Sequence, residues 1–197
     1  MSTVPVRKLM EEQYLELERK AEFKSEFYRG EMFAMSGGSR VHNTIQANLI
    51  RHLGNRLEGT PCQVVGSDLR VLVSATGLYT YSDAVIHCEP SRFLDKQFDT
   101  LLNPTVLFEI LSDSTEKYDR SSKSSQYRKI DSLQEYVLVS QSAPQVEVYQ
   151  RLPEGDWKLR ESADMTASFT LTSVGITIPL SEVYQRVVFP DPDTSVA

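Results

Sequence analysis

Two apolar runs in the middle of the chain each contain one carboxylate. The first run extends from Tyr79 to Glu89 and includes Asp83, and the second extends from Pro104 to Leu111 and includes Glu109. Nearly all of their other positions are apolar, as expected of strands that are covered on both faces. We therefore predict that Asp83 lies at the start of a buried strand and that Glu109 lies within another.

Helical patterns precede and follow these strands. Residues 8–24 place apolar side chains three to five positions apart, which predicts an amphipathic helix of about four turns. Ser39 is a suitable N-cap for a second helix, whose apolar residues recur every four positions from Val41 to Leu57. Several capping candidates stand at residues 112–115, and residues 115–130 predict a third helix despite their many serines.

Short strands separated by turn residues account for most of the remaining chain. Residues 26–35 alternate around Arg29-Gly30 and predict a hairpin, since glycine adopts positive φ easily. Further strands are expected at residues 61–65, 69–73, 135–139, 145–150 and 157–161, with one or two more in 169–188. The pattern predicts an α/β or α+β fold in which helices flank a mixed central β-sheet. We expect one domain over residues 1–189 and a flexible C-terminal tail at 190–197.

The composition predicts a soluble protein of the reducing cytoplasm. Cys62 and Cys88 are the only cysteines in the 197 residues, too few for a disulfide framework. No signal peptide precedes the first helix, and no run approaches the roughly 18 apolar residues of a membrane helix. We expect free thiols and no membrane contact.

The net charge of −6 weighs against a general nucleic-acid binder, because such affinity comes mainly from cations on phosphates. Carboxylates gathered around a metal ion would contribute to this negative charge, while the ion reverses the local field. Basic residues also cluster in two segments, 40–56 and 120–129. Ordinary solvated helix faces are the alternative explanation for both clusters.

Several enzyme classes lack their motifs in this chain. The three histidines, His42, His52 and His87, accompany no nucleophile elbow, and zinc, P-loop and dinucleotide motifs are absent. Paired carboxylates remain, and they serve either glycoside hydrolysis or metal-assisted phosphodiester cleavage. A lysine near the two carboxylates is explained only by the second chemistry.

In this hypothesis Asp83 and Glu109 bind Mg²⁺ or Mn²⁺, and the carbonyl of Ile110 adds a third oxygen. Lys123 orients the attacking water or neutralises developing charge. His42, in the first turn of the second helix, would meet a phosphate beside the free helix N–H groups. The alternatives are a salt bridge for Glu109, a surface pair with Asp119 for Lys123, and a capping or surface role for His42.

Five parts of the sequence carry a resemblance to a known superfamily. They are residues 28–42, residues 81–83, residues 103–120, the pair Lys123 and Tyr127, and residues 133–140. Here the chain resembles the PD-(D/E)XK nuclease superfamily, and within it a bacterial family labelled "putative restriction endonucleases" of uncharacterised function. The resemblance implies a restriction-endonuclease-like core with additional antiparallel strands, a metal-dependent endonuclease acting on DNA, and often a homodimer.

The chain departs from the superfamily pattern at two positions. Leu111 stands where the lysine usually follows the glutamate, and Ser82 replaces the proline before the aspartate. The positive charge would then come from Lys123 on the following helix. The superfamily commonly adds an acid from an N-terminal element, for which Glu31 is our candidate, with Glu26 as the second choice. The rival interpretation is an inactive nuclease-fold protein that binds nucleic acid or a protein partner.

Overall fold

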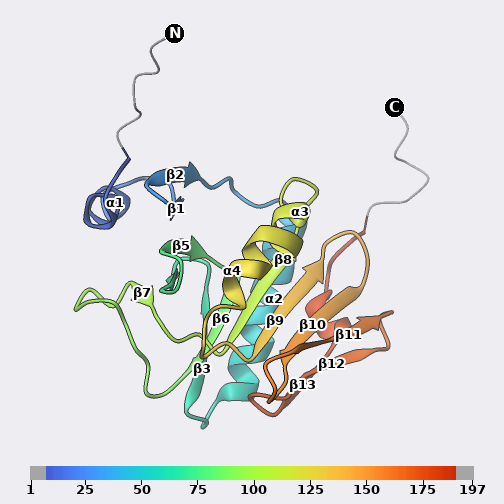
Figure 1. Ribbon diagram of the computed structural model, residues 1–197. Coiled ribbons are helices and arrows are strands. Elements are labelled where there is room, and N and C mark those ends of the chain that lie inside the picture. Colours follow the sequence, from blue (N-terminus) through green and yellow to red (C-terminus); the bar gives the residue numbers. More distant parts are fainter. Residues whose placement is uncertain (1–7, 190–197) are drawn as a thin grey trace, which may run out of the picture.

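The computed structural model describes residues 8–189, shown in Figure 1. Its strands form three sheets, and they are accompanied by one long helix and several short ones. The helical elements are α1 (Glu11–Glu18), α2 (Arg40–Leu57), α3 (Glu116–Tyr118), the π-helical turn η1 (Asp119–Lys123), α4 (Ser124–Tyr127) and α5 (Leu180–Val183). The strands are β1 (Ser25–Tyr28), β2 (Glu31–Ala34), β3 (Cys62–Gly66), β4 (Arg70–Val73), β5 (Leu78–Tyr81), β6 (Ala84–Cys88), β7 (Thr100–Leu101), β8 (Val106–Leu111), β9 (Glu135–Ser140), β10 (Gln145–Arg151), β11 (Trp157–Ala163), β12 (Ser168–Leu171) and β13 (Ile176–Pro179).

The largest sheet has six strands in the order β11-β10-β9-β8-β6-β3. Strands β8 and β9 are parallel, whereas the other neighbours are antiparallel. Strand β8 is buried at all six positions, because helices cover both faces of the sheet. The predicted mixed sheet with flanking helices is confirmed.

Helix α2 covers one face of this sheet through the predicted four-residue stripe. Ile45, Leu49 and Leu53 are fully buried and pack with alternate residues of β8, including Phe108. The side chain of Ser39 caps the helix by accepting a hydrogen bond from the His42 N–H at 3.1 Å. The opposite face of β8 packs against α4 (Figure 1).

A second sheet has the order β2-β1-β5-β4-β7, and the chain passes from it into the main sheet between β5 and β6. The predicted single strand from Tyr79 to Glu89 is therefore wrong. The cause is Ser82, whose hydroxyl donates to the carbonyl of Phe108 at 2.6 Å and accepts from its N–H at 3.1 Å. The Ser82 hydroxyl takes the place of a backbone acceptor for the Phe108 N–H at the point where the chain turns from one sheet to the other.

The helix predicted over residues 115–130 is present as a continuous helical segment over residues 116–127. The segment folds as α3, η1 and α4 in succession, with a π-helical turn at Asp119–Lys123. The first helix is likewise shorter than predicted, at Glu11–Glu18. The hairpin β1–β2 and the strands β9, β10 and β11 lie where the sequence predicted them.

Cys62 and Cys88 face each other on β3 and β6 and are joined by a disulfide. The expectation of free thiols is therefore wrong for this pair, because the sequence alone could not show that the two residues are cross-strand partners. Between residues 8 and 189, no helix combines the length and the apolar character needed to cross a membrane. The tail predicted at 190–197 lies outside the described residues.

Candidate active site

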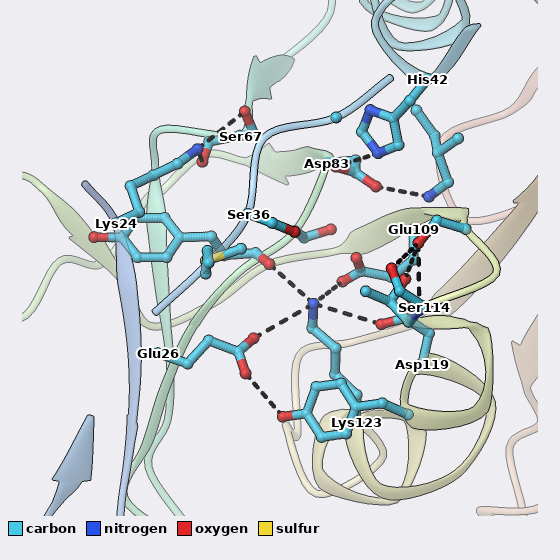
Figure 2. A pocket seen from close by; sticks show the side chains of 18 of the residues that line it. Lys24, Glu26, Ser36, His42, Ser67, Asp83, Glu109, Ser114, Asp119 and Lys123 are labelled. Carbon is cyan, nitrogen blue, oxygen red and sulfur yellow. Dashed lines mark hydrogen bonds and ion pairs between the residues drawn. The ribbon is translucent and has the colours of Figure 1, made fainter. Parts of the chain in front are cut away.

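The ammonium group of Lys123 lies in a buried cluster of carboxylates (Figure 2). Its Nζ is 3.0 Å from Glu109 Oε1 and 3.5 Å from Glu26 Oε1. Asp119 Oδ1 is 3.7 Å away, and the carbonyl of Tyr81 accepts a hydrogen bond from Nζ at 3.1 Å. Because Lys123 is only 4% exposed, its charge is compensated by these groups rather than by water.

Local structure explains why these side chains converge. Alternation along β8 directs Glu109 towards the face covered by α4, where Tyr127 donates a hydrogen bond to Glu109 Oε1 at 2.9 Å. In the next segment, the π-helical turn places Asp119 and Lys123 on the same inward face, four residues apart. Single π-helical turns occur frequently at functional sites.

Asp83 lies between β5 and β6, at the edge of the cluster. Its Oδ2 accepts a hydrogen bond from the Ile110 N–H at 2.7 Å, and its Oδ1 is 3.2 Å from His42 Nε2. Gln46, one turn further along α2, donates to the Asp83 carbonyl at 2.8 Å. Both oxygens of this carboxylate are therefore held in fixed directions by the start of α2 and by β8.

The N-terminal acid of the cluster is Glu26 rather than Glu31. Glu26 is 8% exposed on β1, where its carboxylate accepts hydrogen bonds from Tyr118 at 2.9 Å and from Thr80. Glu31 is exposed on β2 and does not line the pocket. Both residues lie on the same face of the hairpin, but Glu26 is on β1, which pairs with β5, whereas Glu31 begins the edge strand β2 directly after the turn.

Burial and neighbouring charges perturb the ionisation of the cluster. Burial raises the pKa of Glu109 well above its usual range, although Lys123 opposes this shift. Burial also raises the pKa of Asp119. For Lys123 burial favours the neutral amine, but Glu109, Glu26 and Asp119 outweigh it and raise the pKa of Lys123 well above its usual range. The lysine is therefore a cation, surrounded by more carboxyl groups than it can balance.

These residues line a cavity of about 990 Å³. One wall is formed by β1, β2 and the segment 35–39, and others by the start of α2, the ends of β5 and β8, and the α3–η1 turn. Figure 2 shows the carboxylates of the cluster converging on the Lys123 ammonium, with His42 and Asp83 meeting beside them.

The donor atoms fit a hard divalent cation. Between residues 8 and 189, no three side chains of the His, Cys, Asp or Glu type are grouped closely enough to hold an ion by themselves. A site here therefore needs backbone oxygen besides Asp83 and Glu109. Ile110 is suited to supply it: strand alternation directs its carbonyl to the same side as its N–H, which already bonds Asp83.

Comparison with known proteins agrees with this architecture. The family model described as "Uma2: Putative restriction endonuclease" matches residues 11–181. The chain belongs to the Uma2 family. The Uma2 match extends over the whole cluster, from Glu26 to Lys123.

Two relatives of this Uma2 protein come from Synechocystis sp. (strain ATCC 27184 / PCC 6803 / Kazusa). The uncharacterized protein slr1290 is 33% identical over 187 residues, which cover 95% of this chain and 97% of that protein. The uncharacterized protein sll1609 is 34% identical over 149 residues, covering 76% of this chain and 84% of that protein. Neither name states an activity.

A solved structure shares the fold. The crystal structure of a "putative nuclease belonging to DUF820" from Anabaena variabilis ATCC 29413 matches with a TM-score of 0.71 and covers 90% of this chain and 98% of that one. The sequence identity is 14%, so this match shows the fold alone. It confirms the predicted restriction-endonuclease-like fold class.

Sequence reasoning missed several members of the cluster. Asp119 is considered from the sequence only in the alternative of a surface pair with Lys123, yet it is 3% exposed and faces inward. Tyr118 and the carbonyl of Tyr81 were not singled out, because their contacts with Glu26 and Lys123 join distant parts of the chain. Glu26 was the second choice from the sequence for the N-terminal acid, and it lies shortly before the hairpin turn on β1.

Proposed function

We propose that this Uma2 protein is a Mg²⁺- or Mn²⁺-dependent nuclease that hydrolyses phosphodiester bonds in DNA. The observation that carries the proposal is the excess of carboxyl groups over cations around Lys123 and Asp83, in a cavity large enough for a nucleotide. Four acids, Glu26, Asp83, Glu109 and Asp119, share one buried lysine and one histidine. A divalent cation would relieve this excess.

The residues that would hold the ion are Asp83, Glu109 and the carbonyl of Ile110. When bound, Mg²⁺ or Mn²⁺ would supply Lewis-acid chemistry, which draws charge from a phosphate and acidifies water. Asp83 is already oriented for this role, since His42 and the Ile110 N–H hold its two oxygens. Preorganisation of this kind costs no rearrangement during the reaction.

Lys123 takes the role of the catalytic cation. Its ammonium is fixed between Glu109 and the Tyr81 carbonyl, and its remaining N–H can donate to the attacking water or to a phosphate oxygen. The superfamily motif has a lysine where this chain has Leu111, and in this proposal Lys123 of the π-helical turn supplies the ammonium group instead. Glu26 would tune this ammonium through its contact at 3.5 Å.

Cleavage assays test the proposal directly. The purified chain is incubated with supercoiled plasmid and with circular single-stranded DNA, in Mg²⁺, Mn²⁺ or EDTA. We expect metal-dependent cleavage of at least one substrate, and a loss of about 100-fold or more in Asp83→Asn, Glu109→Gln and Lys123→Met. Asp131→Asn is the matched control, because Asp131 is exposed and does not line the cavity.

Calorimetric titration with Mn²⁺ separates this proposal from an inactive nuclease-fold protein. We expect binding to the parent that is lost in Asp83→Asn and retained in Asp131→Asn. Binding without cleavage of either DNA would favour the inactive relative. If the parent bound neither Mn²⁺ nor Mg²⁺, the metal-dependent mechanism would be refuted.

A further inference from the structure

The burial of the residues at the centre of the cavity restricts the shape of a ligand that could reach them. Glu109 and Lys123 are each 4% exposed, and the segment 35–39 forms part of the wall in front of them. This segment is attached at both ends: the Met35 N–H bonds the Lys24 carbonyl at 2.9 Å, and Ser39 Oγ lies 2.9 Å from the side-chain oxygen of Gln141. The wall therefore connects the second sheet to the main sheet.

A volume of about 990 Å³ is that of a pocket for a compact ligand rather than for a double helix. An unpaired nucleotide can enter such a pocket, as in enzymes that extrude a base from the stack before acting on it.

Two partly exposed aromatic side chains line the same cavity. Phe33 on β2 is 49% exposed and Tyr118 on α3 is 38% exposed. The Phe33 ring contributes little to the core, since Phe33 lies on β2, an edge strand of the second sheet. Aromatic rings at a polar, charged cavity are the surfaces on which unpaired bases stack.

A groove of about 570 Å³ adjoins the cavity along α2. Asn43 lines both spaces. Three arginines line the groove, Arg40, Arg51 and Arg186, and none of its lining residues is acidic. In a chain with a net charge of −6, this concentration of positive charge is suited to a phosphate backbone.

We infer that the cavity and the groove together bind an unpaired polynucleotide strand rather than a duplex. One nucleotide enters the cavity and stacks on Phe33 and Tyr118, and the flanking phosphates follow Arg40, Arg51 and Arg186 along α2. This inference rests on the proposed function for the chemistry in the cavity, and it adds the class of substrate.

Fluorescence anisotropy measures the binding independently of cleavage. The probes are a 5′-fluorescein 20-nucleotide DNA strand, the same sequence as duplex DNA, and the same sequence as single-stranded RNA, each in EDTA and in Ca²⁺. We expect single strands to bind at least about 10-fold more tightly than the duplex. The DNA and RNA arms show which sugar is preferred. Equal or tighter binding of the duplex would overturn the inference.

Two variants locate the strand. Phe33→Ala should weaken single-strand binding by about 10-fold. Phe98→Ala is its control, because Phe98 is 65% exposed and does not line the cavity. The double variant Arg40→Gln with Arg186→Asn should lower the slope of log affinity against log salt by about 1.4, or 0.7 for each lost phosphate contact.

The outcomes distinguish this inference from the nuclease proposal. Single-strand preference that depends on Phe33 and the two arginines, with no cleavage in Mg²⁺ or Mn²⁺, would support the inference and count against the nuclease. Metal-dependent cleavage of duplex and single strand at equal rates, with no effect of Phe33→Ala on binding, would support the nuclease and overturn the inference.

Discussion

Replacing Lys123 by methionine removes the cation from the carboxylate cluster while keeping most of the side-chain volume. The ammonium contacts Glu109 at 3.0 Å and Glu26 at 3.5 Å, and all three residues are buried. Removing one partner of a buried ion pair costs about 3–5 kcal/mol, because the other charge is left without compensation. In a chain of this size that corresponds to a melting temperature lower by about 6–20 °C.

The loss should depend on pH in a defined direction. The pKa of Glu109 is already raised by burial, and removal of Lys123, which opposes this shift, raises it further. When folding raises the pKa of a carboxyl group, that group stabilises the fold most at a pH below its unfolded pKa, which is about 4.3 for glutamate. This stabilisation is lost as the pH rises through the pKa of the folded state. The deficit of Lys123→Met should therefore widen between pH 5 and pH 8.

Thermal and urea unfolding in EDTA, followed by circular dichroism, measure this deficit at both pH values. Lys158→Met is the control, since Lys158 is exposed on β11. If the proposed metal site exists, added Mn²⁺ should restore more stability to Lys123→Met than to the control, because the ion would also compensate the carboxylates that have lost the ammonium. A deficit at pH 8 no larger than that of Lys158→Met would refute the reasoning that Lys123 compensates charged carboxylates.

Three further predictions concern the scaffold. Arg19 donates a hydrogen bond to Asp99 and lowers the pKa of Asp99 from 3.8 to about 2. The Asp99 carboxylate therefore stabilises the fold at a pH above its unfolded pKa, and this contribution is lost as the pH falls towards 2. Asp99→Asn should therefore show a smaller fall in urea midpoint than the parent between pH 4.5 and pH 2.5, and an equal fall would contradict the assignment. Leu53→Ala should cost about 2–5 kcal/mol by urea unfolding, against less than about 0.5 kcal/mol for the exposed Leu159→Ala. Glu135 is fully buried and accepts four hydrogen bonds from the β12–β13 turn. Glu135→Gln should therefore lower the free energy of unfolding by about 1–3 kcal/mol and speed amide exchange in that turn. Unchanged exchange would exclude this role for Glu135.

The helices and strands that could be predicted are those with a regular pattern of apolar residues over a short stretch of sequence. The stripe from Val41 to Leu57 predicts α2, because one face of a helix packs on the core. The apolar run around Glu109 predicts the central strand β8, because only a strand covered on both faces is apolar at successive positions.

The parts that were not predictable depend on contacts between distant residues. Tyr79 to Glu89 reads as one strand, and only the hydrogen bonds between Ser82 and Phe108 divide it between two sheets. The pairing of Cys62 with Cys88 depends in the same way on the register of β3 against β6. For the cluster, the sequence identified Lys123 and the carboxylates that interrupt apolar strands, whereas the burial of Asp119 depends on how its helix packs on the sheet.

The π-helical turn makes the position of Lys123 sensitive to chain length. Each residue of an α-helix advances the side-chain direction by about 100°. Deleting one residue between Asp119 and Lys123, such as Ser121 or Ser122, would convert the turn to an ordinary helical one and change the position of Lys123 relative to Asp119 and Glu109. Among relatives that keep every charged residue, a single insertion or deletion in this turn could therefore add or remove the lysine from the cluster. Alignments of such proteins should be compared by the length of this turn as well as by residue identity.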